Sequence, residues 1–184
     1  SGRSVKAKAV VMAIGAAPET SLAKNCGIEI GKTGGILVNH NYQTNYPDIY
    51  AVGDVVEVTN KLTGDKTKLA LAGPADHMFG KYHNNKGVIG SSCLHLFDLT
   101  IANTGLNEKM CKRYGINYDF AYTIPNDKVG LMPSPHPIFF KLIFEVPTCK
   151  ILGAQAISKG NAEKRIDVIA AIIAMGGTLE DLKE

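Results

Sequence analysis

The stretch IFFKLIFEVPTCKILGAQAI, residues 138–157, decides the fold of the second half of the chain. Lys141 and Glu145 alternate with apolar residues, and this period of two predicts a strand whose apolar face carries Ile138, Phe140, Leu142, Phe144 and Val146. Residues 147–150 form a Pro-containing turn, and residues 151–157 are again apolar. The stretch therefore predicts an antiparallel hairpin.

A helix is predicted directly after this hairpin, at residues 161–175. Asn161 suits its N-cap and Gly176 its end. One apolar stripe follows helical spacing and contains Ile166, Ile169, Ala170 and Ile173, and a second apolar side contains Val168, Ala171 and Ile172. A helix with two apolar sides must bury both, so we expect one side on its own sheet and the other on a partner subunit.

The preceding segments complete an α+β unit. Residues 91–102 alternate enough to predict a single strand with Cys93, His95, Phe97, Leu99 and Ile101 on one side. A short helix is predicted between Asn107 and Gly115, and a further strand at residues 118–124. Thr178 and Asp181 resemble a capping box. The order predicts an antiparallel sheet with helices on one face.

The first half is less regular. The apolar run AVVMAI, residues 9–14, predicts a buried strand, and its position so near the first residue indicates a chain that is part of something longer. Residues 21–25 predict a helical turn, residues 31–39 a turn and a strand, residues 49–52 a short strand, and residues 57–68 a surface hairpin.

Two motifs in this half can carry chemistry. In YAVGD, residues 50–54, Gly53 permits close backbone approach and Asp54 offers a carboxylate to a ligand hydroxyl, although a strand-ending Gly-Asp turn explains the same residues. In LALAGPA, residues 69–75, the Gly-Pro pair suits a helix start whose free N–H groups face an electron-rich ligand, or a helix start with nothing bound.

An ordered set of segments resembles a known family. VVMAIGAAPET, GGILVNHNYQTNYPDIYAVGD, LALAGPA, FDLTIANTGLNEK, PTCKILGAQAI and KRIDVIAAII occur in the order typical of the C-terminal half of pyridine nucleotide–disulfide oxidoreductases, in the coenzyme A-disulfide reductase and NADH oxidase branch. The resemblance implies three parts. Residues 1–16 are a remnant of the NAD(P)H domain, residues 17–87 are the C-terminal segment of the FAD-binding domain, which is an α/β domain, and residues 88–184 are the dimerisation domain.

The resemblance also implies the site. Gly53 and Asp54 match the motif whose Asp binds a ribityl hydroxyl of FAD, and Ala72 and Gly73 match the backbone that approaches the pyrimidine edge of the flavin. The family's GxGxxG fingerprint and redox cysteine have no counterpart here, so no catalytic residue is assigned, and we expect the chain alone to bind no cofactor and to be inactive. The parent protein is expected to use FAD and NAD(P)H on a small disulfide, a persulfide or oxygen.

Three hypotheses remain open: a part of such an oxidoreductase, a stand-alone non-catalytic dimerisation or scaffold module, or a coenzyme A-binding module. In each we expect a cytoplasmic homodimer. The scattered basic residues disfavour nucleic acid, no apolar run has transmembrane length, and neither the five histidines nor the four cysteines show metal spacing. Cys149 stands where the family usually has glycine, and LMPSPHP, residues 131–137, matches a loop near the partner's active site, where His136 is a substrate-contact candidate or part of a plain Pro-rich loop.

Overall fold

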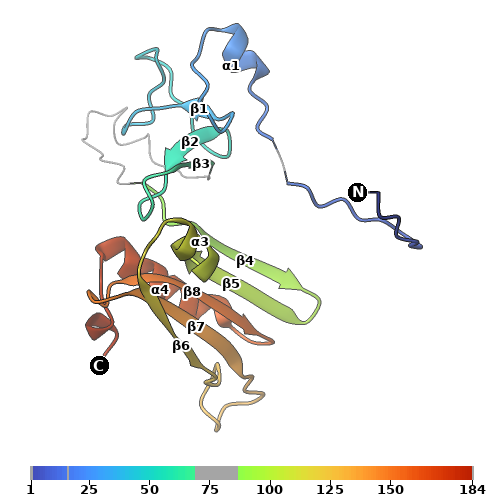
Figure 1. Cartoon of the computed structure of the whole chain (residues 1–184), viewed down its shortest axis with the longest axis vertical. Helices are drawn as coiled ribbons and strands as arrows, with labels where there is room; N and C mark the ends of the chain where they lie inside the picture. Colours follow the sequence, from blue (N-terminus) through green and yellow to red (C-terminus); the bar gives the residue numbers. More distant parts are fainter. Residues whose placement is uncertain (1, 16, 69–86, 184) are drawn as a thin grey trace.

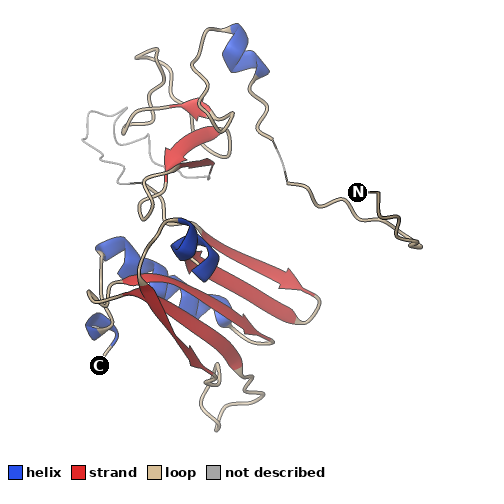
Figure 2. Cartoon of the chain, viewed as in Figure 1, coloured by secondary structure: helices blue, strands red, loops and turns tan. Residues whose placement is uncertain are grey.

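The computed structural model describes residues 2–15, 17–68 and 87–183 (Figure 1). The described residues form a three-stranded sheet with the order β1-β2-β3 and a five-stranded sheet with the order β4-β5-β8-β7-β6. Figure 2 shows the smaller sheet next to one end of the larger sheet, on the side where the β2–β3 turn lies.

The larger sheet is antiparallel throughout and is centred on the predicted hairpin. β8 pairs with both β7 and β5, while β6 and β4 form the two edges. The strand bounds are β4 Ser91–Leu96, β5 Leu99–Gly105, β6 Tyr118–Thr123, β7 Ile138–Glu145 and β8 Ile151–Ser158. The predicted hairpin and the predicted strand near residues 118–124 are confirmed.

The single strand predicted at residues 91–102 is wrong. The chain reverses at Phe97 and Asp98, and β4 pairs with β5 as a tight hairpin in which Cys93 lies opposite Ala102 and Leu94 opposite Ile101. Phe97 takes a positive φ of 55°, which is uncommon for a non-glycine residue. Because alternation continues through the turn, the sequence pattern hides the reversal and assigns Cys93 and Ile101 to the same face.

Helix α4, Ala162–Met175, covers one face of this sheet (Figure 1). Its buried residues join β5, β7 and β8 in a core that contains Ala102, Ile138, Leu142, Ile151, Ala154, Ala156, Ala162, Ile166, Ile169, Ile172 and Ile173. The predicted helix is confirmed, and Gly176 ends it in the left-handed conformation. Of the second apolar side, Ile172 is buried, whereas Val168 and Ala171 are exposed.

The short helix α3, Glu108–Arg113, lies on the other side of the sheet. Asn107 caps it as predicted, because its side-chain oxygen accepts a hydrogen bond from the Met110 N–H at 2.9 Å. Cys111 is fully buried and packs with Ile143, whose neighbour Leu142 belongs to the core under α4. The α+β class with an antiparallel sheet is therefore confirmed. The helices do not all lie on one face as expected, since α4 covers one face and the short α3 packs on the other.

The first half folds around a much smaller core. Its elements are α1 Ser21–Asn25, β1 Ile36–Leu37, β2 Val56–Thr59 and β3 Lys66–Lys68, with β1 parallel and β3 antiparallel to β2. The core cluster here contains Ala23, Ile36, Ala51, Val56, Val58 and Val88. The predicted helical turn, the strand in residues 31–39 and the hairpin in residues 57–68 are confirmed.

The buried strand predicted at residues 9–14 is wrong for this chain. Residues 9–14 belong to no strand, and their side chains are exposed; Val11 is 88% exposed. A strand needs hydrogen-bonded neighbours, and the described residues supply none beside this run.

The Thr178–Asp181 capping interaction is present at the start of the short 3₁₀ helix η1, Glu180–Leu182. Among the described residues, no helix combines the length and the apolar character that crossing a membrane requires.

Candidate functional site

The Gly53-Asp54 turn lies immediately before β2. Gly53 has a φ of 83° and open space where a Cβ would stand, so the backbone conformation rather than crowding favours glycine here. The Val56 N–H donates to the Gly53 carbonyl at 3.2 Å, which closes the turn. The Asp54 carboxylate is exposed and has no hydrogen-bond or ion-pair partner among the described residues. A ligand hydroxyl could therefore donate to it without displacing another contact.

The strand predicted at residues 49–52 is wrong. Tyr50 forms only an isolated bridge with Gln43, and the Ala51 N–H donates to the Tyr42 carbonyl at 3.0 Å. Asp54 thus lies at the amino end of β2, not at the carboxyl end of a preceding strand. A continuous strand would need a ladder of paired residues with at least one neighbouring strand, and the described residues provide only this isolated bridge.

The other two predicted site residues, Ala72 and Gly73, lie outside the described residues. Their assignment remains a prediction from the resemblance.

Glu57 is a buried carboxylate that the sequence analysis placed in a surface hairpin. It is 4% exposed and accepts hydrogen bonds from the Thr33 N–H at 2.8 Å and the Thr33 hydroxyl at 2.7 Å. A Cβ at Gly31 would come within 2.2 Å of its Oε2 atom, so the 31–34 turn closes around the carboxylate. Glu57 thereby fixes β1 beside β2, close to Asp54. In the sequence, the one indication of this buried contact was the glycine-rich turn GKTGG, residues 31–35.

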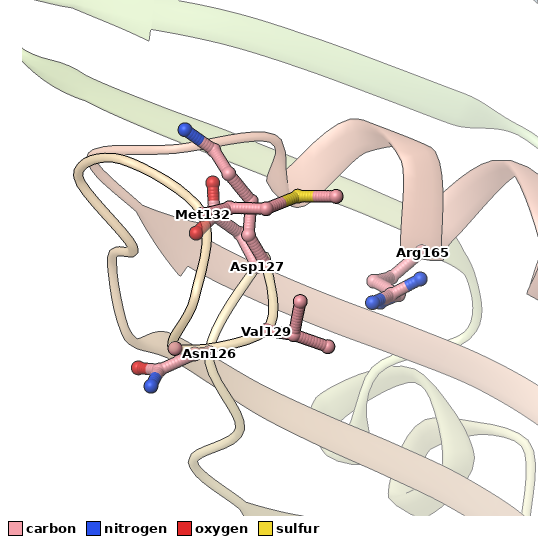
Figure 3. Close-up of a pocket in the computed structure, with 7 residues that line it drawn as sticks. Asn126, Asp127, Val129, Met132 and Arg165 are labelled. Atoms are coloured by element: carbon pink, nitrogen blue, oxygen red, sulfur yellow. The ribbon is translucent and has the colours of Figure 1, made fainter.

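A pocket of about 500 Å³ lies under the loop between β6 and β7 (Figure 3). Figure 3 shows Val129 and Met132 beside the Arg165 side chain, which comes from α4. The Asp127 carboxylate accepts a hydrogen bond from the His136 N–H at 2.7 Å, and this contact is the main cause that lowers the pKa of Asp127. This contact orders the loop, and Lys128 and Arg165 are the two cationic residues that line the pocket.

His136 takes part in this loop through its backbone and does not line the pocket. The Lys128 ammonium donates to the Pro133 and Ser134 carbonyls at 3.1 and 3.3 Å, which closes the loop on itself. Asp127 was not among the residues predicted from the sequence; its one signal there is its position in the turn-forming run PND, residues 125–127.

The four cysteines form no disulfide. Cys26 and Cys93 are exposed, Cys111 is buried, and Cys149 is half-buried. Burial raises the pKa of the Cys111 thiol, which disfavours the reactive thiolate. Within residues 2–15, 17–68 and 87–183, no group of three metal-ligating side chains comes together.

Two family models match the chain. The model for pyridine nucleotide-disulphide oxidoreductase matches residues 1–77, and the model for the dimerisation domain of the same family matches residues 92–184.

Named relatives cover almost the whole chain. An NAD(P)H sulfur oxidoreductase (CoA-dependent) from Pyrococcus furiosus is 34% identical over 98% of this chain, and a coenzyme A disulfide reductase from Staphylococcus epidermidis is 29% identical over 95% of it. The chain spans 42% of the length of each of these relatives.

Solved structures agree with these relatives. The crystal structure of reduced CoADR-RHD from Bacillus anthracis has a TM-score of 0.85 and 41% identity over 92% of this chain and 32% of that chain. An NAD-dependent persulfide reductase from A. fulgidus has a TM-score of 0.82 and 34% identity over 90% of this chain and 32% of that chain.

Proposed function

The chain belongs to the pyridine nucleotide-disulphide oxidoreductase family, and we propose that it is the C-terminal part of an FAD-dependent NAD(P)H oxidoreductase of the coenzyme A-disulfide reductase or NADH oxidase type. Residues 1–16 then belong to the NAD(P)H domain, residues 17–87 to the FAD domain and residues 88–184 to the dimerisation domain. The single observation that carries the proposal is the match of both family models in order along one chain.

The substrate class follows from the relatives. Their printed names include coenzyme A disulfide reductase, persulfide reductase and NADH oxidase, so the proposed substrate of the whole protein is a small disulfide, a persulfide or oxygen. The proposed location is the cytoplasm.

Asp54 is the described residue proposed to hold the flavin. Its exposed carboxylate lacks a partner among the described residues, and Gly53 leaves open space beside it, so the pair fits a hydrogen-bond acceptor for a ribityl hydroxyl. Bound FAD would supply hydride acceptance and electron transfer. Asp54 would orient the cofactor chain, and Glu57 would keep β2 and its preceding turn in place beside β1.

From the sequence, the homodimer was expected to use the second-half sheet and the helix at residues 161–175. We propose it instead through the face of the large sheet that α4 does not cover, because Ile172 of the second apolar side of α4 is buried within the chain. Leu94, Ile101, Ile157 and Phe139 lie opposite one another across β4, β5, β8 and β7 and thus form one row on the same face. Phe139 is 58% and Leu94 57% exposed. Exposed apolar rows of this kind are typical of protein interfaces.

The experiment is to extend the coding sequence upstream of Ser1 and to purify the protein that it encodes. We expect an in-frame GxGxxG fingerprint, a single redox cysteine and a yellow protein with FAD bound at one per chain. The Asp54→Asn variant should weaken FAD binding by about tenfold or more, because a hydrogen bond to a charged group contributes about 1.5–3 kcal/mol. Asp48→Asn, in an exposed loop of the same half, is the matched control and should bind FAD normally.

Two results would refute the proposal. One is an upstream frame without a dinucleotide fingerprint, which would favour the stand-alone dimerisation module. The other is the 184-residue chain itself binding FAD at stoichiometry, because the proposed site needs the rest of the FAD domain.

A further inference from the structure

The β2–β3 turn, residues 60–65, joins the small first-half sheet to the larger second-half domain. It follows β2, whose first residue is two positions after Asp54. β2 has four residues and therefore spans about 13 Å at the usual strand rise. A displacement of this turn would therefore move the carboxyl end of β2, a short strand whose other end lies two residues after Asp54.

The turn is rigidly built. The Asn60 side-chain oxygen accepts hydrogen bonds from the Leu62 N–H at 2.9 Å and the Thr63 N–H at 3.1 Å. The Asn60 N–H donates to the Asp65 carbonyl at 2.8 Å, and Gly64 takes a φ of 74°. These contacts fix the conformation of the turn and, with it, the position of Leu62.

Leu62 contacts the second-half domain on both sides of its sheet. It packs against the core under α4 and also against the cluster of Leu106, Cys111, Ile143 and Leu152 beside α3. Among the described residues it is the one side chain that packs against both clusters.

Two polar contacts flank Leu62. The Lys61 ammonium donates to the Ala174 carbonyl in the last turn of α4, where the helix dipole favours a cation. The Tyr114 hydroxyl, at the end of α3, donates to the Asp65 carboxylate, and this contact is the main cause that raises the pKa of Tyr114. The turn is therefore held at α3, at α4 and between them.

The small sheet needs such an anchor. Its strands have two, four and three residues, and among the described residues its core cluster contains six buried apolar residues, so the sheet buries little apolar surface of its own. The second link to the larger domain is the chain itself, where the Val88 N–H donates to the Thr59 carbonyl at 2.9 Å and the Lys61 N–H to the Val88 carbonyl at 2.7 Å.

We propose that Leu62 is a positioning residue: by inserting between the α3 and α4 sides of the dimerisation domain, it holds β2, and with it the Asp54 turn, in the geometry that FAD binding requires. The part that concerns FAD depends on the proposed function. The mechanical part does not, since it concerns only the order of β2 relative to the large sheet.

Hydrogen exchange on the intact 184-residue chain, without flavin, tests the mechanical part. The readout is the ratio of amide exchange rates in β2 to those in β8, because a locally opened sheet exchanges independently of the global unfolding reaction. In Leu62→Ala we expect this ratio to rise about tenfold, and in Leu62→Met, which conserves volume, to stay within about threefold of the parent chain.

Leu179→Ala is the matched control. Leu179 is another partly buried leucine that packs against the α4 core and does not belong to the turn. It should lower global stability and leave the β2 to β8 ratio within about twofold of the parent chain. If Leu62→Ala does not fold, Tyr114→Phe, which removes the contacts of the hydroxyl to Asp65 and Thr63 in the turn, should still raise the ratio by about threefold.

The proposal would be overturned if Leu62→Ala gave the same β2 to β8 exchange ratio as the control Leu179→Ala. The same holds for Tyr114→Phe where it replaces Leu62→Ala. In the extended flavoprotein, Leu62→Ala should weaken FAD binding by about threefold or more while Leu62→Met restores it. If the exchange ratio rises in Leu62→Ala but FAD binding is unchanged in Asp54→Asn, the role of Asp54 in the proposed function is refuted. The mechanical role of Leu62 is then retained.

Discussion

The carboxylate of Asp181 holds the start of η1. The Thr178 N–H donates to it at 2.6 Å and the Thr178 hydroxyl at 3.0 Å, and these donors hold its pKa below the ordinary value of 3.8. A lowered pKa in the folded state means that the stabilisation is present above the unfolded-state pKa and is lost as the pH falls through the folded-state value.

We therefore predict that thermal stability falls, partly through this group, as the pH is lowered from about 5 through the folded-state pKa of Asp181, which lies below 3.8. The Asp181→Asn variant should be less stable at pH 6 and should lose less stability on acidification than the parent chain. Thermal unfolding at several pH values measures both effects. Asp167→Asn, at an exposed carboxylate on α4, is the control, and an acid response of Asp181→Asn identical to that of the parent chain would contradict the prediction.

Cys149 occupies a turn position that suits glycine. Its φ is 58°, in the left-handed region that is uncommon for residues other than glycine. Cys149→Gly should raise the free energy of unfolding by ~0.5–1 kcal/mol, because it removes left-handed strain that slightly exceeds the entropy cost of glycine.

Denaturant unfolding measures the effect of Cys149→Gly. The control Cys93→Gly, inside β4, should lower the free energy of unfolding by ~0.5–1 kcal/mol. Destabilisation by Cys149→Gly would show that the thiol contributes more than the strain costs.

Helix α4 stabilises the domain through one face. Ile173 is 1% exposed in the core between the helix and the sheet. Ile173→Ala should lower the free energy of unfolding by ~2–5 kcal/mol, through lost apolar burial and the remaining cavity. Met175→Ala, at a side chain that is 79% exposed on the same helix, should change it by less than about 0.5 kcal/mol. Urea unfolding followed by circular dichroism compares the two, and equal effects would contradict the packing of α4 described above.

Elements with a strong local pattern were predictable, and those that depend on a single backbone angle were not. The alternation of β7 and the helical spacing of α4 each repeat over many residues, so both were found. The β4–β5 hairpin was missed because its reversal depends on Phe97, a residue with no turn preference, in a left-handed conformation.

At the scale of the whole molecule, the exposed apolar row of Leu94, Ile101, Ile157 and Phe139 predicts that two copies of the chain associate. Light scattering should give twice the 19.7 kDa chain mass, and Phe139→Lys should shift the population toward monomer by placing an ammonium in the apolar row. Leu22→Lys, on α1 in the first half, is the control and should remain dimeric. A monomeric parent chain would contradict the proposed interface.

The sequence by itself determined the antiparallel α+β domain, the central hairpin, α4 and the family, because periodic burial and an ordered set of motifs are encoded locally. It also placed the glycine and the carboxylate of the candidate site. The tertiary structure decided that residues 9–14 are exposed, that residues 49–52 form no strand, that Glu57 is buried and that Leu62 packs between α3 and α4. Strand formation and burial require partners distant in sequence, and no local pattern specifies which partners a folded chain supplies.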